Sequence, residues 1–332
     1  MKCTAISRST KFPTFSFSNQ PIELLMISLN WTLPVYFVLS VAVCLSVTWL
    51  ELSVLKNRIS VYTANVSFFV LMTGWLLFYL FFYWDREIHA TVSSLSGVYV
   101  LSALMKSVSY SQVSNQLRMW LREESANPAR NLKCSYSLIT QEVIRELRRG
   151  EVTPEDLLGY GAMLRFVFYP TFCFQLKFQR TNRINWKKVV RNFSIMGVQM
   201  LIAMFVLMEL LVPLIKRSYS LVANSKHPIL DISLIAIRVS VCGTIVHHAM
   251  FAGLLVGFTN GLAELTYFAH RDFFLDWWNM GSIDDFWRKW NRPVHQFLKR
   301  HIAMPLLESV DLSATSSKRC ILDRLHRQWN RT

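Results

Sequence analysis

Charged residues are scarce in this chain of 332 residues. Asp, Glu, Lys and Arg make up 17% of it, while hydrophobic residues make up 52% and the mean hydropathy is +0.27. Soluble domains contain roughly a quarter charged residues, so this composition excludes an ordinary soluble protein. The apolar residues lie in runs of the length that a helix needs to cross a hydrocarbon core, about 20 residues. The sequence therefore predicts an integral membrane protein.

The sequence also lacks the spacings that disulfide frameworks and metal centres require. Its 6 cysteines are scattered, with no Cys-x-x-Cys pair and no Cys/His ligand pattern. We therefore expect free thiols, and no bound metal or cofactor. No compact apolar core follows the basic residues near the start, so we expect no cleavable signal peptide.

Acidic residues are few compared with basic ones. Lys and Arg number 36 against 21 Asp and Glu, which gives a formal net charge of +15. The basic residues lie in short segments between apolar runs, as cytosolic loops facing anionic lipid do. The expected partner is thus the lipid bilayer, and nucleic acid is excluded.

About six hydrophobic segments are expected to form an all-α, polytopic helical bundle. They cover residues 31–55, 61–83, 91–104, 157–176, 193–215 and 229–268. Outside them, residues 141–149 are predicted to form a solvated helix. Residues 282–300 are predicted to form an amphipathic helix, with acidic residues near its N-terminus.

The segment at 157–176 differs from the others. It contains Gly159, Arg165 and Pro170, and the loops on both sides of it are rich in Lys and Arg. Such loops favour the cytosol, and a single crossing would put one of them on the other side. We therefore expect a re-entrant or broken segment, with Arg165 facing a polar cavity.

The last apolar segment carries polar groups where they are costly. They are Arg238, His247, His248, Asn260 and Glu264. Polar groups at membrane depth usually line an interior path, so we expect the same here. For His247 and His248, an interior hydrogen-bonding role is favoured over catalysis.

An aromatic motif follows this segment. Residues 273–279 read Phe-Phe-Leu-Asp-Trp-Trp-Asn, and indole rings between polar residues suit a membrane–water boundary. The motif resembles the Phe-Tyr-x-Asp-Trp-Trp-Asn signature of the membrane-bound O-acyltransferase family, in its sterol and diacylglycerol acyltransferase branch. Flanking residues that match the same branch are Asn260, Glu264, Arg271, Trp290-Asn291, Pro293-Val294-His295 and Arg300-His301.

The resemblance implies an enzyme of the endoplasmic reticulum membrane. Such an enzyme transfers a fatty acyl group from acyl-CoA, the co-substrate, to a lipid hydroxyl. In the family a membrane-buried histidine is the general base and the motif asparagine is its partner, which here is Asn279. Residues 22–306 would be part of the family's transmembrane domain, between a polar extension at 1–21 and a polar tail at 307–332. A homo-oligomer is possible.

The resemblance also implies substrate contacts around the motif. The residues concerned are Phe273, Phe274, Asp276, Trp277, Trp278, Arg271, Glu264 and His295. For Trp277 and Trp278, packing at the interface is an equal alternative. The basic residues at 177–191 could attract CoA phosphates, although positive charge that only sets the topology is the favoured interpretation.

Diacylglycerol is the favoured acceptor, and sterol is the alternative. Ser109-Tyr110 and His227-Pro228 look more like the diacylglycerol enzymes, whereas Arg180-Thr181 with Trp186 is similar to the sterol enzymes.

The chain departs from the family pattern at several positions. Phe274 replaces the motif tyrosine, and Val256 replaces a histidine that often stands before Asn260. The window at 312–319, where the family has its catalytic histidine in an apolar helix, is polar and contains no histidine. An inactive paralogue that binds lipid or acyl-CoA, or a chain lacking the family's last spans, is therefore kept as an alternative.

Overall fold

The computed structural model describes residues 31–84, 90–126, 139–223 and 228–306. These residues are mostly helical, and an isolated antiparallel bridge between Arg180 and Phe268 is the β pairing found among them. The all-α prediction is confirmed. The predicted extension at 1–21 and tail at 307–332 lie outside the described residues.

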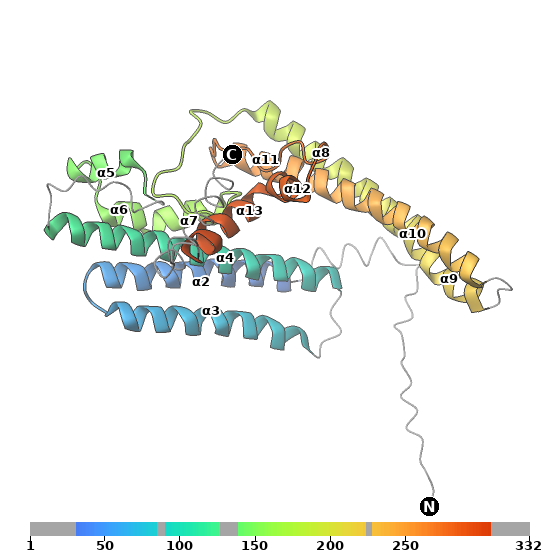
Figure 1. Ribbon diagram of the computed structural model, residues 1–332, viewed down its shortest axis with the longest axis horizontal. Coiled ribbons are helices and arrows are strands. Elements are labelled where there is room, and N and C mark those ends of the chain that lie inside the picture. Colours follow the sequence, from blue (N-terminus) through green and yellow to red (C-terminus); the bar gives the residue numbers. More distant parts are fainter. Residues whose placement is uncertain (1–30, 85–89, 127–138, 224–227, 307–332) are drawn as a thin grey trace, which may run out of the picture.

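Three long helices form an N-terminal bundle (Figure 1). α2 (Thr32–Leu55) packs against α3 (Val61–Trp84) and, over a longer contact, against α4 (Ala90–Ala126). The bundle core includes Val47, Val100, Leu117, Trp120, Leu158 and Phe166. Much of the apolar surface of α3 stays exposed, as expected of a helix that faces lipid.

The remaining long helices form an arm that extends obliquely from the bundle (Figure 1). One rod consists of α8 (Trp186–Phe205), the π-helical η2 (Val206–Leu211) and α9 (Val212–Ala223). The returning rod consists of α10 (Pro228–Phe251), the π-helical η3 (Ala252–Phe258) and α11 (Thr259–Leu265). The predicted apolar segment at 229–268 is therefore one continuous helical rod up to Leu265.

Four helices are long and apolar enough to cross a membrane. They are Thr32–Leu55, Val61–Trp84, Trp186–Ser218 and Ile229–Leu265. Four of the predicted hydrophobic segments thus form candidate spans, and the chain is a membrane protein. The segment at 91–104 lies inside α4, where several serines, of which Ser96 is buried, lower its hydropathy.

The segment at 157–176 is broken, as predicted. α6 (Pro154–Leu158) ends at Gly159, and α7 (Tyr160–Phe168) ends at Tyr169, whose backbone is extended, as the residue before a proline favours. A helix rises about 1.5 Å per residue, so neither piece can span a core of roughly 30 Å.

The prediction that Arg165 faces a polar cavity was wrong. Its side chain is exposed, because α7 turns Met163 and Phe166 into the core and Arg165 toward the outside. A different cation stabilises the end of α7. The buried Lys106 Nζ donates hydrogen bonds to three carbonyl oxygens there, those of Phe166 (2.6 Å), Val167 (2.9 Å) and Tyr169 (2.7 Å).

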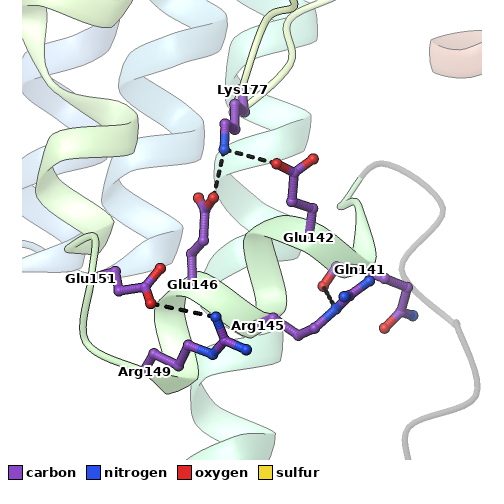
Figure 2. Close-up of polar contacts among 7 residues, drawn as sticks. All are labelled: Gln141, Glu142, Arg145, Glu146, Arg149, Glu151 and Lys177. Atoms are coloured by element: carbon purple, nitrogen blue, oxygen red, sulfur yellow. Dashed lines mark hydrogen bonds and ion pairs between the residues drawn. The ribbon is translucent and has the colours of Figure 1, made fainter.

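The predicted solvated helix is α5 (Gln141–Arg148). Lys177, the first cation of the basic loop, donates to Glu146 Oε1 (2.5 Å) and to Glu142 Oε1 (2.9 Å), as Figure 2 shows. These two carboxylates hold the pKa of Lys177 above its ordinary value. Lys177 therefore fixes the start of the basic loop against α5.

Candidate functional site

The motif at 273–279 forms a loop between α11 and the next helix, α12 (Ile283–Trp290). Backbone hydrogen bonds hold it to the helices that follow. The Arg292 N–H donates to the Phe273 carbonyl (3.0 Å), and the Leu275 N–H donates to the Lys289 carbonyl (2.9 Å). Phe273 is buried, so the first motif residue is a packing anchor.

The predicted amphipathic helix at 282–300 is two helices, and the single-helix prediction was wrong. α12 ends at Asn291, and α13 (Arg292–Leu298) begins there. Asn291 caps α13 through its side chain, which accepts from the Val294 N–H (3.4 Å), and a proline stands in the first turn. Proline at this position starts a new helix instead of continuing the old one.

Glu264 and Arg271 position the motif loop. Glu264 is buried at the end of α11, where it forms an ion pair with Arg271 Nη1. Its other carboxylate oxygen accepts from the Asn185 N–H (2.8 Å), at the start of α8. Both residues thus hold the loop against the arm, and a direct substrate contact stays a prediction.

Trp277 enters an aromatic cluster on the arm. Its ring centroid lies 4.6 Å from that of Trp290 and 5.3 Å from that of Phe251. Trp290 also stacks on His247, with centroids 5.3 Å apart and planes 5° apart. The rings therefore join α10, the motif loop and α12. The packing role considered for Trp277 is observed, whereas Trp278 is 64% exposed.

An apolar groove of about 740 Å³ lies beside this cluster. Its walls come from α8, α10, η3 and the motif loop, and its apolar side chains include Ile202, Ile245, Val256, Phe274, Trp277 and Trp278. Gln199, Thr244 and His248 also line it. A groove of this size and character suits an acyl chain or a lipid.

A smaller, cationic pocket of about 120 Å³ lies between the motif loop and the helices that follow it. It is lined by Arg288, Lys289, Arg292, His295 and Lys299, together with Leu275, Asp285 and Gln296. Burial, followed by the charges of Lys299, Arg288 and Arg292, lowers the pKa of His295. The buried Nε of Arg292 has no hydrogen-bond partner within the described part of the chain. A bound anion would satisfy this donor and offset the excess positive charge.

The sequence contained a signal for this pocket that our prediction did not use. Three of its side chains, at 292, 295 and 299, recur with the spacing of one helix face and lie on the continuous run of α13 and η4. Of the residues implied by the family resemblance, His295 was expected and lies in the pocket. The basic loop at 177–191 does not contribute to its lining.

Asn279 and Asp276 lie on the outer side of the motif loop. Both side chains are exposed, and the Asn279 N–H donates to the Asp276 carbonyl (3.4 Å). Neither residue is among those that line the groove or the cationic pocket. The structure therefore does not bring the predicted catalytic partner into the groove.

His301, which matches the family pattern, is buried. It lies in the π-helical η4 (Lys299–Ala303), with its Nδ1 2.7 Å from Gln112 Oε1 and its Nε2 2.8 Å from Ser109 Oγ. The Gln112 Nε2 donates to the His301 carbonyl (3.1 Å), which fixes the amide orientation. Nδ1 therefore carries the proton, and Nε2 accepts from the serine hydroxyl. This cluster ties the C-terminal helices to α4.

Comparison with known proteins identifies the family and several relatives. The model of the membrane-bound O-acyltransferase family matches residues 59–317. The chain is similar to Diacylglycerol O-acyltransferase 1 of Bos taurus, with 30% identity over 65% of this chain and 42% of that protein. The proteins of the same name from Arabidopsis thaliana and Corylus americana are 35% and 31% identical over 50% of this chain, and 32% and 31% of their own length. The matched region is thus less than half the length of each of these relatives.

Proposed function

The chain belongs to the membrane-bound O-acyltransferase family, and on that basis we propose that it transfers a fatty acyl group from acyl-CoA to a lipid hydroxyl. Diacylglycerol is the proposed acceptor, because the relatives named above are diacylglycerol O-acyltransferases. Sterol is the alternative acceptor. The endoplasmic reticulum membrane is the proposed location.

The observation that carries this proposal is the pair of pockets on the motif loop. Leu275 lines the cationic pocket, while its neighbours Phe274 and Trp277 line the apolar groove. A molecule with anionic phosphates at one end and an acyl chain at the other matches both pockets. Acyl-CoA has this chemistry, so we assign its phosphates to the cationic pocket and its acyl chain to the groove.

The reaction needs more than binding. A neutral hydroxyl is a poor nucleophile, and a base within hydrogen-bond reach has to accept its proton. Negative charge that develops on the thioester oxygen needs a donor. By the family resemblance Asn279 is the partner of the base at the reaction centre. It would have to turn from its exposed position toward the groove when substrate binds.

The proposal is tested with membranes that contain the expressed chain. Labelled oleoyl-CoA is offered together with diacylglycerol and a sterol, and labelled triacylglycerol is the expected product. Labelled sterol ester in its place would identify the alternative acceptor. The Asn279→Ala variant should stay in the membrane and form no product.

Acyl-CoA binding without transfer is the second candidate function. It is favoured by the position of Asn279 outside both pockets. Saturable binding of oleoyl-CoA by a chain that forms neither labelled product would establish it and refute the transferase proposal.

A further inference from the structure

Lys177 lies outside the cationic pocket, but a continuous path of contacts joins it to that pocket. It is not among the residues that line the pocket or the groove. Its ammonium group bridges Glu146 and Glu142 of α5, at 2.5 Å and 2.9 Å (Figure 2). α5 is itself fixed on the bundle, because its Val143 and Ile144 belong to the buried core. Lys177 is therefore held on a well-packed support.

The residues after Lys177 contact the segment that precedes the motif. The antiparallel bridge between Arg180 and Phe268 is flanked by two backbone hydrogen bonds, of 3.0 Å and 3.2 Å. Phe178, next to Lys177, also packs beside Phe268, with ring centroids 6.0 Å apart. Residues 177–181, which we call the strap, therefore connect α5 to the segment before the motif.

The segment before the motif in turn contacts the cationic pocket. Arg271 pairs with the buried Glu264, and two residues later the Phe273 carbonyl accepts from the Arg292 N–H (3.0 Å). Arg292 lines the pocket, and its buried Nε has no hydrogen-bond partner among the described residues. The position of this guanidinium therefore depends, through the strap, on where α5 holds Lys177.

We propose that Lys177 is a positioning residue for acyl-CoA, which fixes the cationic pocket through the strap without touching the ligand. This inference rests on the proposed function, because acyl-CoA is the ligand assigned to the pocket. It gives α5 a part in substrate binding. When the contact of Lys177 with Glu142 and Glu146 is lost, the strap can shift, and Arg292 no longer meets the CoA phosphates in its favourable geometry.

The first experiment compares Lys177→Met and Lys177→Arg in the purified full chain, with oleoyl-CoA and diacylglycerol. Exposed ion pairs are weak, so Lys177→Met should raise the KM for oleoyl-CoA about two- to fivefold. The kcat and the KM for diacylglycerol should change little. Lys177→Arg keeps the charge and can donate to both carboxylates, so it should stay close to the wild type. An unchanged KM for oleoyl-CoA in Lys177→Met overturns the inference.

Changes on α5 separate positioning from long-range attraction between charges. The double variant Glu142→Gln/Glu146→Gln removes the contact and makes this region more positive. Long-range attraction alone would then lower the KM for the anionic oleoyl-CoA, whereas loss of positioning should raise it, as in Lys177→Met. Adding Lys177→Met to the double variant should cause little further rise, because the contact is already lost. A lower KM in the double variant overturns the inference.

The neighbouring pair of Arg149 and Glu151 is the matched control (Figure 2). It lies 3.5 Å apart at the end of the same helix, and within the described part of the chain it does not pair with the strap. Arg149→Gln should therefore leave the KM for oleoyl-CoA as it is in the wild type. A rise equal to that of Lys177→Met would assign the effect to net charge and overturn the inference.

Equilibrium binding of labelled oleoyl-CoA tests the inference without turnover. The Kd should rise in Lys177→Met and in the double variant by the same factor as the KM. Such a rise in a chain that forms no product supports the positioning role and refutes the proposed transfer. Equal Kd values in the wild type and Lys177→Met overturn the positioning role alone. A wild type that shows no saturable binding refutes both proposals.

Discussion

The buried imidazole of His301 makes the stability of the protein depend on pH. Its side chain is 4% exposed, and burial, followed by the charge of Arg300, lowers its pKa to about 4. An unfolded chain has a histidine pKa of about 6.5, so below that pH the unfolded state binds a proton that the folded state does not. Protonation of this histidine therefore does not lower the free energy of unfolding above pH about 6.5. As the pH falls from there toward 4, the free energy of unfolding decreases by on the order of 3 kcal/mol.

This dependence can be measured by thermal unfolding of the detergent-solubilised protein at neutral and mildly acidic pH. The wild type should lose stability on acidification, and His301→Gln, which cannot be protonated, should lose less. The exposed His270 provides the control, because His270→Gln should leave the pH dependence as it is in the wild type. Equal acid sensitivity of His301→Gln and the wild type would show that another group is responsible.

The cationic pocket makes a separate prediction for acyl-CoA. Arg292→Gln and Lys299→Gln each remove a charge from the pocket. A hydrogen bond to a charged group contributes about 1.5–3 kcal/mol, so each change should raise the KM for oleoyl-CoA about tenfold or more. The kcat should change little, because these side chains are not at the thioester.

Two exposed lysines of the basic loop serve as controls for this prediction. Lys187→Gln and Lys188→Gln remove the same charge from the start of α8. They should leave the KM for oleoyl-CoA nearly unchanged. An equal rise of the KM in all four variants would mean that the overall positive charge of this face attracts the phosphates. The pocket would then not be a specific phosphate site.

The two rods of the arm lie close together at Gly257. A Cβ placed there would lie 2.8 Å from the backbone nitrogen of Met196 and 2.9 Å from the carbonyl oxygen of Asn192. Backbone atoms cannot move aside as a flexible side chain can. Gly257→Ala should therefore force η3 away from α8 and destabilise the protein by about 1–3 kcal/mol, the usual effect of overpacking.

A second glycine on the same rod isolates this effect. A Cβ at Gly243 in α10 would meet nothing within 4 Å. Alanine has the better helix propensity by roughly 1 kcal/mol, so Gly243→Ala should be neutral or stabilising. Thermal unfolding in one detergent compares the two variants. A similar loss of stability in both would mean that loss of glycine flexibility, not contact with α8, is the cause.

Local signals in the sequence predicted most helices, because helix length, hydropathy and capping are properties of neighbouring residues. Ser282 was expected to begin a helix, and its hydroxyl accepts from the Asp285 N–H (3.1 Å). The break at Asn291 was missed because the apolar spacing continues across it. The approach of His248 to Trp277 could not be predicted either, since it depends on how the motif loop folds back on α10, and periodicity within one helix contains no information on that contact.

Contacts between distant segments place several loops at one end of the molecule. Lys56, in the turn between α2 and α3, pairs with Glu155 in α6 (2.8 Å). Lys177 pairs with α5, and the backbone bridge of Arg180 to Phe268 joins the basic loop to the residues before the motif. These contacts predict that all these segments lie on one side of the membrane. Their excess of Lys and Arg predicts the cytosolic side.

This arrangement predicts a topology that cysteine labelling can test. Single cysteines are placed at Arg149, Lys187 and Ile229 in a chain whose 6 native cysteines are replaced. Arg149 and Lys187 precede and follow the broken α6–α7 segment, whereas Ile229 lies at the start of α10, away from the motif loop.

In sealed microsomes, with the cytosolic face outward, an impermeant maleimide should label Arg149→Cys and Lys187→Cys directly. Ile229→Cys should be labelled only after permeabilisation, because one full span separates it from Lys187. If Arg149→Cys and Lys187→Cys were labelled from opposite sides, α6 and α7 would have to cross the membrane, and the cationic pocket and the α5 contacts could not share one face.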